Sequence, residues 1–296
     1  MKGSIKNKPE HFIVREVPLY SVSGEGDHYY YELTKVNMNT DQALRYLAKK
    51  YDIPQREIGH AGRKDKIAVT TQMISLPIQI DSMKSDELEL CYVGNHNNKL
   101  RTGHLKGNEF EIKVKVPELN QIQDFHKIKE SILEFGFPNY FGDQRFSKSN
   151  FQIGMRIFNG EKVKYSKPKR LFYLSAFQSF IFNTWLEKRI LSDSLINPVD
   201  GDLSLLNGEV VSGPIFGTKM KSPTSKALEI EDCLKEQFEI TYEKLENNKL
   251  KGNRRAARVL LKNIDISSWE EGVCFKFYLP KGSYATSLLR EFVDIE

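Results

Sequence analysis

The chain has 296 residues, which is enough for one large domain or two modest ones. Hydrophobic residues make up 40% and charged residues 28%, as in a soluble globular protein, and no apolar run approaches the roughly 18 residues of a membrane span. The net charge of +5 is too small to indicate a nucleic-acid partner by itself.

Side-chain periodicity predicts the elements in chain order. Alternating or β-branched runs predict strands at 12–17, 27–33, 67–76, 110–116 and 273–279. Helical spacing predicts helices at 39–51, 119–135, 171–190 and, as "SLLREFV", 287–293, with Thr40 as the N-cap of the first and Gly136 as the C-cap of the second. Because strands and helices interleave without a steady βαβ rhythm, we expect an α+β fold with a mainly antiparallel sheet.

The middle of the chain differs in character. From about residue 160 to 250 the sequence is lysine-rich and weakly periodic around one apolar helix, which indicates a second domain. Three basic segments lie in this region or at its ends: 162–170, 219–226 and 248–262. Such segments fit phosphate contacts, although a solvated lysine-rich surface explains any single one of them better.

Several kinds of chemistry have no signal in the sequence. There is no P-loop, no CxxC, no histidine pair at i, i+4 spacing and no G-x-S-x-G, so neither a cofactor nor a metal is expected. The three cysteines, Cys91, Cys233 and Cys274, are far apart, which favours reduced thiols in the cytoplasm over a disulfide framework.

The stretch "HAGRKDKIAVTTQ" (60–72) contains one aspartate between two lysines. Gly62 permits a turn that would project Asp65 from a loop before a strand. Lys64 and Lys66 would favour the ionised carboxylate if either reached it, and an ionised carboxylate can act as a nucleophile or a general base. The alternative is an exposed loop charge.

A second stretch, "GFPNYFGDQRF" (136–146), has four aromatic residues mixed with amides and an arginine. Aromatic faces can stack on nucleic-acid bases, and amide or guanidinium groups can bind base edges or phosphate. Core packing of a loop is the alternative at this point.

The sequence resembles the TruD family of tRNA pseudouridine synthases. Nine stretches match in order: 9–17, 24–40, 60–72, 98–110, 136–146, 174–183, 208–214, 254–260 and 277–292. The resemblance is weakest over 215–250. It implies a pseudouridine-synthase catalytic domain with a mainly antiparallel central sheet, formed by 1–160 and 251–296, and an inserted family-specific α/β domain at 161–250.

The resemblance also implies a function. We expect isomerisation of uridine to pseudouridine in tRNA, at uridine 13 of the D-arm, without a cofactor and with the target base flipped into a cleft. The expected partner is tRNA, with no DNA or membrane partner, and the expected state is a monomer. Two alternatives stay open: the same chemistry on other tRNA sites or messenger RNA, and an RNA-binding or tRNA-folding module.

Five site residues follow from the resemblance. Asp65, in "GRKD", is the expected catalytic carboxylate, and Phe141, in "PNYF", is expected to stack on the uracil. Asn139 is expected to hydrogen-bond near Asp65 or the uracil. Lys64 is expected to keep Asp65 charged, and Glu16 to pair with a nearby cation.

Overall fold

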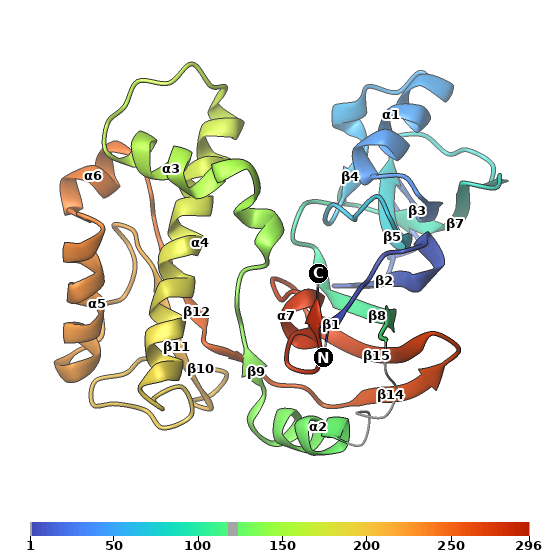
Figure 1. Ribbon diagram of the computed structural model, residues 1–296. Helices are drawn as coiled ribbons and strands as arrows, with labels where there is room; N and C mark the ends of the chain where they lie inside the picture. The colour runs from blue at the N-terminus through green and yellow to red at the C-terminus, as the bar shows by residue number, and fades with distance from the viewer. Residues whose placement is uncertain (1, 118–123, 296) are drawn as a thin grey trace. The chain divides into compact units, whose positions relative to one another are not determined.

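The computed structural model describes residues 2–117 and 124–295, and the chain forms two compact units (Figure 1). The first comprises Met1–Leu133, Leu261–Ala285 and Leu289–Glu296, and the second comprises Glu134–Leu260 and Thr286–Leu288. These units change at 134 and 260, whereas the composition places the change near 160 and 250. The insertion of 161–250 into a catalytic domain stays a prediction.

The first unit is built on a nine-stranded sheet with the order β14-β15-β8-β2-β5-β3-β7-β6, and β4 pairs with β5. Within this sheet, over the residues that the structure describes, β2 and β5 pair in parallel and the other pairs are antiparallel, so the expected α+β fold with a mainly antiparallel sheet is confirmed. Its elements, with the small β1–β16 pair, are β1 (Lys2–Gly3), β2 (Phe12–Pro18), β3 (His28–Val36), α1 (Thr40–Lys50), β4 (Gly59–His60), β5 (Val69–Leu76), β6 (Met83–Lys84), β7 (Leu88–His96), β8 (Leu105–Lys115), α2 (Asp124–Phe135, of which the last two residues belong to the second unit), β14 (Ile264–Trp269), β15 (Gly272–Pro280), α7 (Ala285–Leu289, whose middle three residues belong to the second unit) and β16 (Asp294–Ile295).

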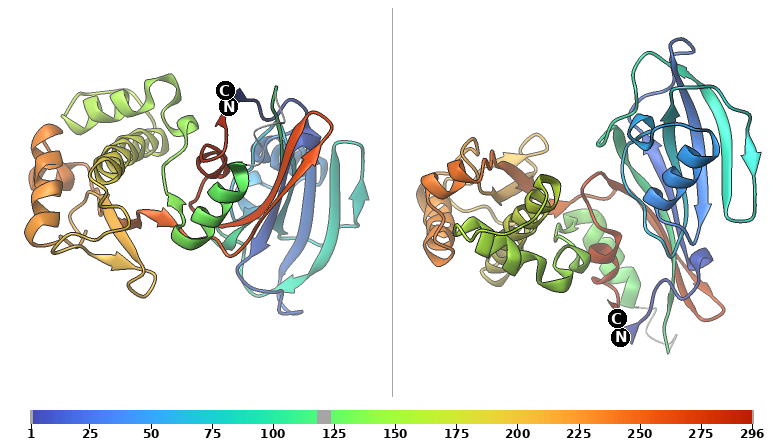
Figure 2. Two further views of the ribbon diagram at one scale, coloured as in Figure 1. Left: turned by 60° about the horizontal axis from the view of Figure 1, so that its bottom comes forward. Right: turned by 90° about the horizontal axis from the view of Figure 1, so that it is seen from above.

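Helix α1 covers one face of the sheet (Figure 2). Its buried side chains, Ala43, Leu44 and Leu47, pack against apolar residues of β3, β5 and β7. The N-cap is Asn39, which forms a capping box with Gln42, and not Thr40 as predicted. The Thr40 side chain is buried and is used elsewhere, as described below.

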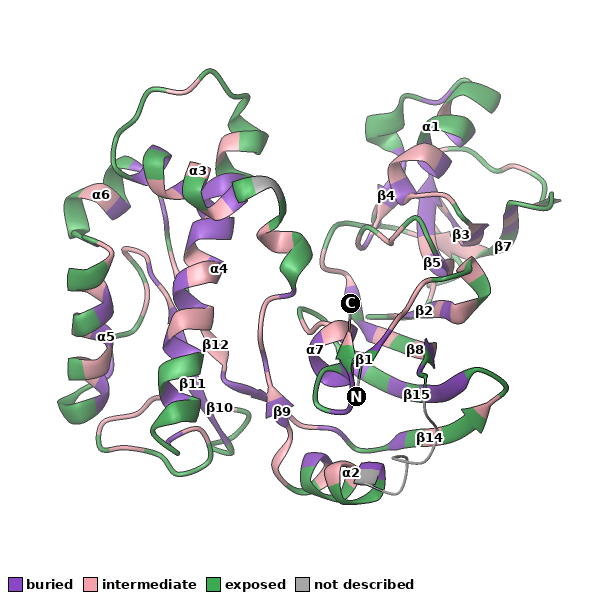
Figure 3. Ribbon diagram, viewed as in Figure 1, coloured by how far each residue is buried: buried purple, intermediate pink, exposed green. Residues whose placement is uncertain are grey.

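The second unit is organised around α4, whose buried residues recur along its length (Figure 3). A helix that is apolar on most sides needs cover on most sides, and α3, α5 and the β10-β11-β12 sheet supply it. The elements are β9 (Phe137–Pro138), α3 (Asn150–Phe158), α4 (Lys167–Leu191), β10 (Ser204–Leu205), β11 (Val210–Ile215), α5 (Ser225–Gln237), α6 (Tyr242–Asn247), β12 (Asn253–Ala256) and β13 (Arg258–Val259), which pairs with β9.

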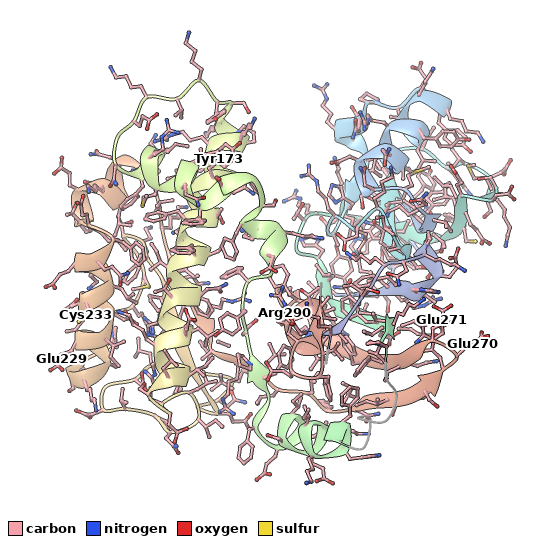
Figure 4. The ribbon with its side chains drawn as sticks, in the orientation of Figure 1. Tyr173, Glu229, Cys233, Glu270, Glu271 and Arg290 are labelled. Atoms are coloured by element: carbon pink, nitrogen blue, oxygen red, sulfur yellow. The ribbon has the colours of Figure 1, made fainter. Side chains whose placement is uncertain are left out.

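Several elements differ from the prediction. The sequence did not reveal β7, β14, α3 or α5, and α7 is shorter than the helix expected there. For the helix predicted at 119–135, residues 119–123 lie outside the described part of the chain, and Gly136 has a φ of 75° directly after α2, as a C-cap requires. The thiols of all three cysteines are free, and Cys233 lies on α5 one turn from Glu229 (Figure 4). In the described residues no helix is both long and apolar enough to cross a membrane.

Candidate active site

The Asp65 loop, residues 61–68, joins β4 to β5 and is held by buried side chains. Thr40 Oγ1 accepts a hydrogen bond from the Lys64 backbone N–H at 2.8 Å and donates to Gln72 Oε1 at 2.8 Å. The Gln72 amide in turn donates to the Gly62 carbonyl at 3.0 Å. The loop backbone is thus fixed on both sides of Arg63, to the start of α1 and to β5.

The expectation for Gly62 is wrong. Its φ is outside the left-handed region, and a Cβ at this position would meet only Lys64 Nζ, at 4.0 Å. The conformation of the loop therefore comes from the hydrogen bonds of Thr40 and Gln72 and does not depend on the freedom of glycine.

The Asp65 carboxylate is paired and still accessible. Lys6 Nζ lies 2.6 Å from Asp65 Oδ2, and 41% of the Asp65 side chain is exposed. The same ammonium lies 4.4 Å from the centre of the Phe12 ring, in a cation–π contact that holds it in place. The ion pair fixes the carboxylate, and the exposure of the side chain leaves it open to an approaching substrate.

Lys64 and Glu16 form a separate, buried pair. Lys64 Nζ lies 2.6 Å from Glu16 Oε2, and Glu16 Oε1 accepts a bond from the Met73 backbone N–H at 3.3 Å. Glu16 is therefore placed beside a cation, as expected for it. Lys64, however, binds Glu16, and the ammonium directly on Asp65 comes from Lys6.

Lys35 lies beneath the Asp65 loop with its side chain fully buried. Its ammonium donates to the Asp65 carbonyl at 2.9 Å and to the Met38 carbonyl. Burial lowers the pKa of Lys35 from 10.5 to about 8, while attraction to the Asp65 charge opposes that fall. Sequence reasoning missed both Lys35 and Lys6, although Lys35 continues the inward alternation of Tyr31 and Leu33.

In the second unit Asn139 is part of the scaffold. Its side chain is buried, its Nδ2 donates to the Ala256 carbonyl at 2.9 Å, and its Oδ1 accepts from Arg255 Nη2 at 2.5 Å. Arg255 also donates from Nη2 to the Asn139 backbone carbonyl at 3.0 Å. A bond from Asn139 to Asp65 or to uracil stays a prediction, and the contacts of its side chain within this unit hold β12 and Arg255.

Phe141 is clamped through its backbone. Its N–H donates to Asn183 Oδ1 at 2.9 Å, and Asn183 Nδ2 donates back to the Phe141 carbonyl at 3.0 Å. The Arg255 guanidinium carbon lies 3.9 Å from the centre of the Phe141 ring, and Phe182 meets the ring edge-to-face at 5.6 Å. Three stretches used for the resemblance, 136–146, 174–183 and 254–260, therefore meet around this ring.

The basic segments divide into exposed and structural cations. The lysines of 162–170 and 219–226 are exposed and suit phosphate contacts. In 248–262 three arginines are used internally: Arg255 binds Asn139, Arg254 pairs with the buried Glu231 at 2.7 Å, and Arg258 donates to the Phe135 and Glu209 carbonyls.

Comparisons with known proteins identify the family. A model of the family tRNA pseudouridine synthase D (TruD) matches residues 1–167 and 207–292. A tRNA pseudouridine synthase D of Thermus thermophilus is 33% identical over 99% of this chain and 89% of that protein. The chain belongs to the tRNA pseudouridine synthase D family. Membership makes it an enzyme, an isomerase.

Other comparisons agree. The tRNA pseudouridine synthase D of Wolinella succinogenes is 33% identical over 97% of this chain and 94% of that protein. A crystal structure of a TruD protein from Methanosarcina mazei has the same fold, with a TM-score of 0.77 at 22% identity over 100% of this chain and 94% of that one. The family model matches 215–250, where the resemblance looked weakest, and leaves 168–206 unmatched. Among the described residues, His, Cys, Asp and Glu form no group of three that could hold a metal.

Proposed function

We propose that this chain converts uridine 13 in the D-arm of tRNA to pseudouridine, with Asp65 as the catalytic carboxylate. Isomerisation of uridine in tRNA follows from family membership, and the position and the residue are the proposal. The observation that carries it is the state of Asp65. Its carboxylate is 41% exposed and lies 2.6 Å from Lys6, on a loop whose backbone is bound by buried side chains.

The reaction breaks the N1–C1′ bond, turns the uracil and joins C5 to C1′. The C5 hydrogen is lost as a proton and N1 gains one, so substrate and product are isomers and no electrons are exchanged with another molecule. The proposed mechanism therefore uses no cofactor. Asp65 can attack C1′, attack the base or remove a sugar proton, and each of these steps uses the carboxylate that lies 2.6 Å from the Lys6 ammonium.

The base has to leave its helix or loop first, which costs a few kcal/mol. We propose that Phe141 stacks on the extruded uracil, a contact of roughly 1–3 kcal/mol per base. The Arg255 guanidinium carbon, 3.9 Å from the centre of the ring, would then lie close to the stacked uracil. Asn139 would support this arrangement by holding Arg255, and the exposed lysines of 162–170 would bind phosphates.

Tritium release from transcripts carrying [5-³H]uridine tests the proposal, because each pseudouridine formed expels the hydrogen at C5. Wild-type protein should release tritium from a tRNA transcript, and Asp65→Asn should lose at least about 100-fold in rate. Asp265→Asn is the control, because Asp265 is an exposed aspartate of the same unit that lies on the edge strand β14. It should keep wild-type activity.

The target is tested with a transcript in which uridine 13 is replaced by cytidine. Loss of release from this transcript supports position 13, whereas continued release would assign the chemistry to another uridine. Equal release by wild type and Asp65→Asn would remove Asp65 from the mechanism. Tight tRNA binding without release would favour the RNA-binding alternative.

A further inference from the structure

Lys35 is an unusual residue for the interior of a sheet. It lies near the end of β3, has 0% of its surface exposed and follows Tyr31 and Leu33 on the inward face of the strand. A lysine ammonium is almost never fully buried without partners, because its loss of hydration is costly. A buried ammonium is therefore expected to bind acceptor groups and to fix the backbone or side chains that carry them.

The two hydrogen bonds of Lys35 identify what it holds. One goes to the backbone carbonyl of Asp65, at 2.9 Å, and the other to the backbone carbonyl of Met38. Met38 precedes Asn39, the N-cap whose reciprocal bonds with Gln42 fix the start of α1. Lys35 thus ties the peptide of Asp65 to a turn that is itself fixed.

The other side-chain hydrogen bonds to the loop backbone described above act on its earlier residues. Thr40 binds the Lys64 N–H, and Gln72 binds the Gly62 carbonyl. Among the described side chains, these bonds do not extend to the peptide of Asp65, which Lys35 binds. The distance between the Asp65 Cα and a substrate therefore depends on this contact more than on the other two.

We propose that Lys35 is a positioning residue for the reaction: its buried ammonium fixes the backbone of Asp65 and places a positive charge beneath the reacting carboxylate. This inference rests on the proposed role of Asp65. Lys35 itself is too deeply buried to touch RNA, so it acts through Asp65.

The pH dependence follows from the groups around the ammonium. The Asp65 carboxylate attracts it, the Lys64 ammonium repels it, and burial lowers its pKa to about 8. Above this pH the neutral amine still has two hydrogens for the two carbonyls. The bonds are then weaker than charge-assisted ones, and the attraction to the Asp65 carboxylate is gone. Turnover should therefore fall as pH rises through about 8.

The test uses Lys35→Met, with Tyr31→Phe as the matched control. Tyr31 is equally buried on the same strand, and its hydroxyl holds the backbone of Ile80, away from Asp65, by bonds of 2.9 and 2.7 Å. In Lys35→Met we expect kcat for tRNA to fall about 100-fold, as for a misplaced catalytic group, with KM near wild type. Tyr31→Phe should keep kcat, and the wild-type fall in turnover near pH 8 should be absent from Lys35→Met.

Hydrogen exchange, followed by mass spectrometry on the same proteins, tests the positioning step without substrate. Exchange of residues 61–68 should become faster in Lys35→Met and stay unchanged in Tyr31→Phe. Unchanged exchange in Lys35→Met, a kcat loss shared by Tyr31→Phe, or a wild-type profile flat through pH 8 would each overturn the proposal. Failure of the proposed function looks different, because Asp65→Asn would then release tritium like wild type whatever the exchange shows.

Discussion

The Asp65 loop of the first unit and residues 139–141 of the second are both fixed through their backbones, but their side chains differ. Asp65 has a carboxylate with 41% exposure and an ammonium partner. Asn139 has 7% exposure, and its amide is bonded to Ala256 and Arg255. A residue shared with a family can therefore be placed for chemistry or for support, and the internal bonds of its side chain tell the two apart. Beside Asn139, the Phe141 ring and the Arg255 guanidinium lie 3.9 Å apart, measured from the ring centre to the guanidinium carbon.

Among changes around residues 139–141, the largest effect should come from the Phe141 ring. Phe141→Leu keeps an apolar side chain but removes the aromatic face, so kcat/KM should fall roughly 5- to 150-fold, the equivalent of about 1–3 kcal/mol of stacking. Phe141→Tyr is the control, since it keeps the ring. Tritium release under subsaturating tRNA measures both. Equal losses in the two variants would mean that ring packing, and not stacking on a base, matters here.

The variant Thr40→Val should lose less activity than Phe141→Leu, and it should also lose stability. Thr40→Val leaves the Lys64 N–H and Gln72 Oε1 without their partner, which costs about 1–3 kcal/mol for buried groups. Urea unfolding measures that loss. Thr34→Val is the control, because it breaks a threonine–threonine bond of 2.9 Å within the sheet. If both variants keep equal kcat, the Asp65 loop does not depend on Thr40.

Changing the Arg255 guanidinium should lower activity less than removing the Phe141 ring on which it stacks. Arg255→Lys keeps the charge but loses the planar group that makes three hydrogen bonds to Asn139 and stacks on Phe141. We expect kcat/KM to fall about 10-fold, the equivalent of about 1.4 kcal/mol. Arg156→Lys, at an exposed arginine of the same unit paired with Glu161, should have no effect. Wild-type kinetics in Arg255→Lys would show that any cation suffices beside Phe141.

Elements of the two units show which features a sequence can reveal. The strand β8 and the helix α1 could be predicted from the sequence, because in each of them the buried residues recur at a fixed period. Helix α5 could not, because its buried face consists of Ala227, Glu231 and Leu234, and the charge in the middle is neutralised by Arg254 from a distant strand.

The candidate site follows the same rule. Asp65 was found from its local segment together with the family resemblance. Its partner Lys6 lies 59 positions away, and no local pattern encodes a contact of that separation. Lys35 had a weak local signal, because it is a cation at a position whose side chain faces inward. The periodicity alone does not give such a lysine a role, and the role becomes visible only from the hydrogen bonds of its ammonium.

The smallest expected effect concerns the stability of wild type relative to Lys35→Met as a function of pH. Burial lowers the pKa of Lys35 to about 8, whereas the unfolded chain keeps the ordinary value of 10.5. Between these two values the unfolded state binds the proton and the folded state does not, so stability should rise with pH in this window. Below about pH 8 both states are protonated, and the burial penalty is present in full.

Urea unfolding of both proteins at several pH values from 7 to 10.5 measures this difference. Above pH 8 the free energy of unfolding of wild type should rise relative to that of Lys35→Met, while wild-type turnover falls over the same range. Stability and activity then move in opposite directions at one residue, as expected where a charge is kept for positioning at a cost to the fold. A constant difference in stability would mean that the ammonium carries no burial penalty, and the case for a charge retained against its cost would fail.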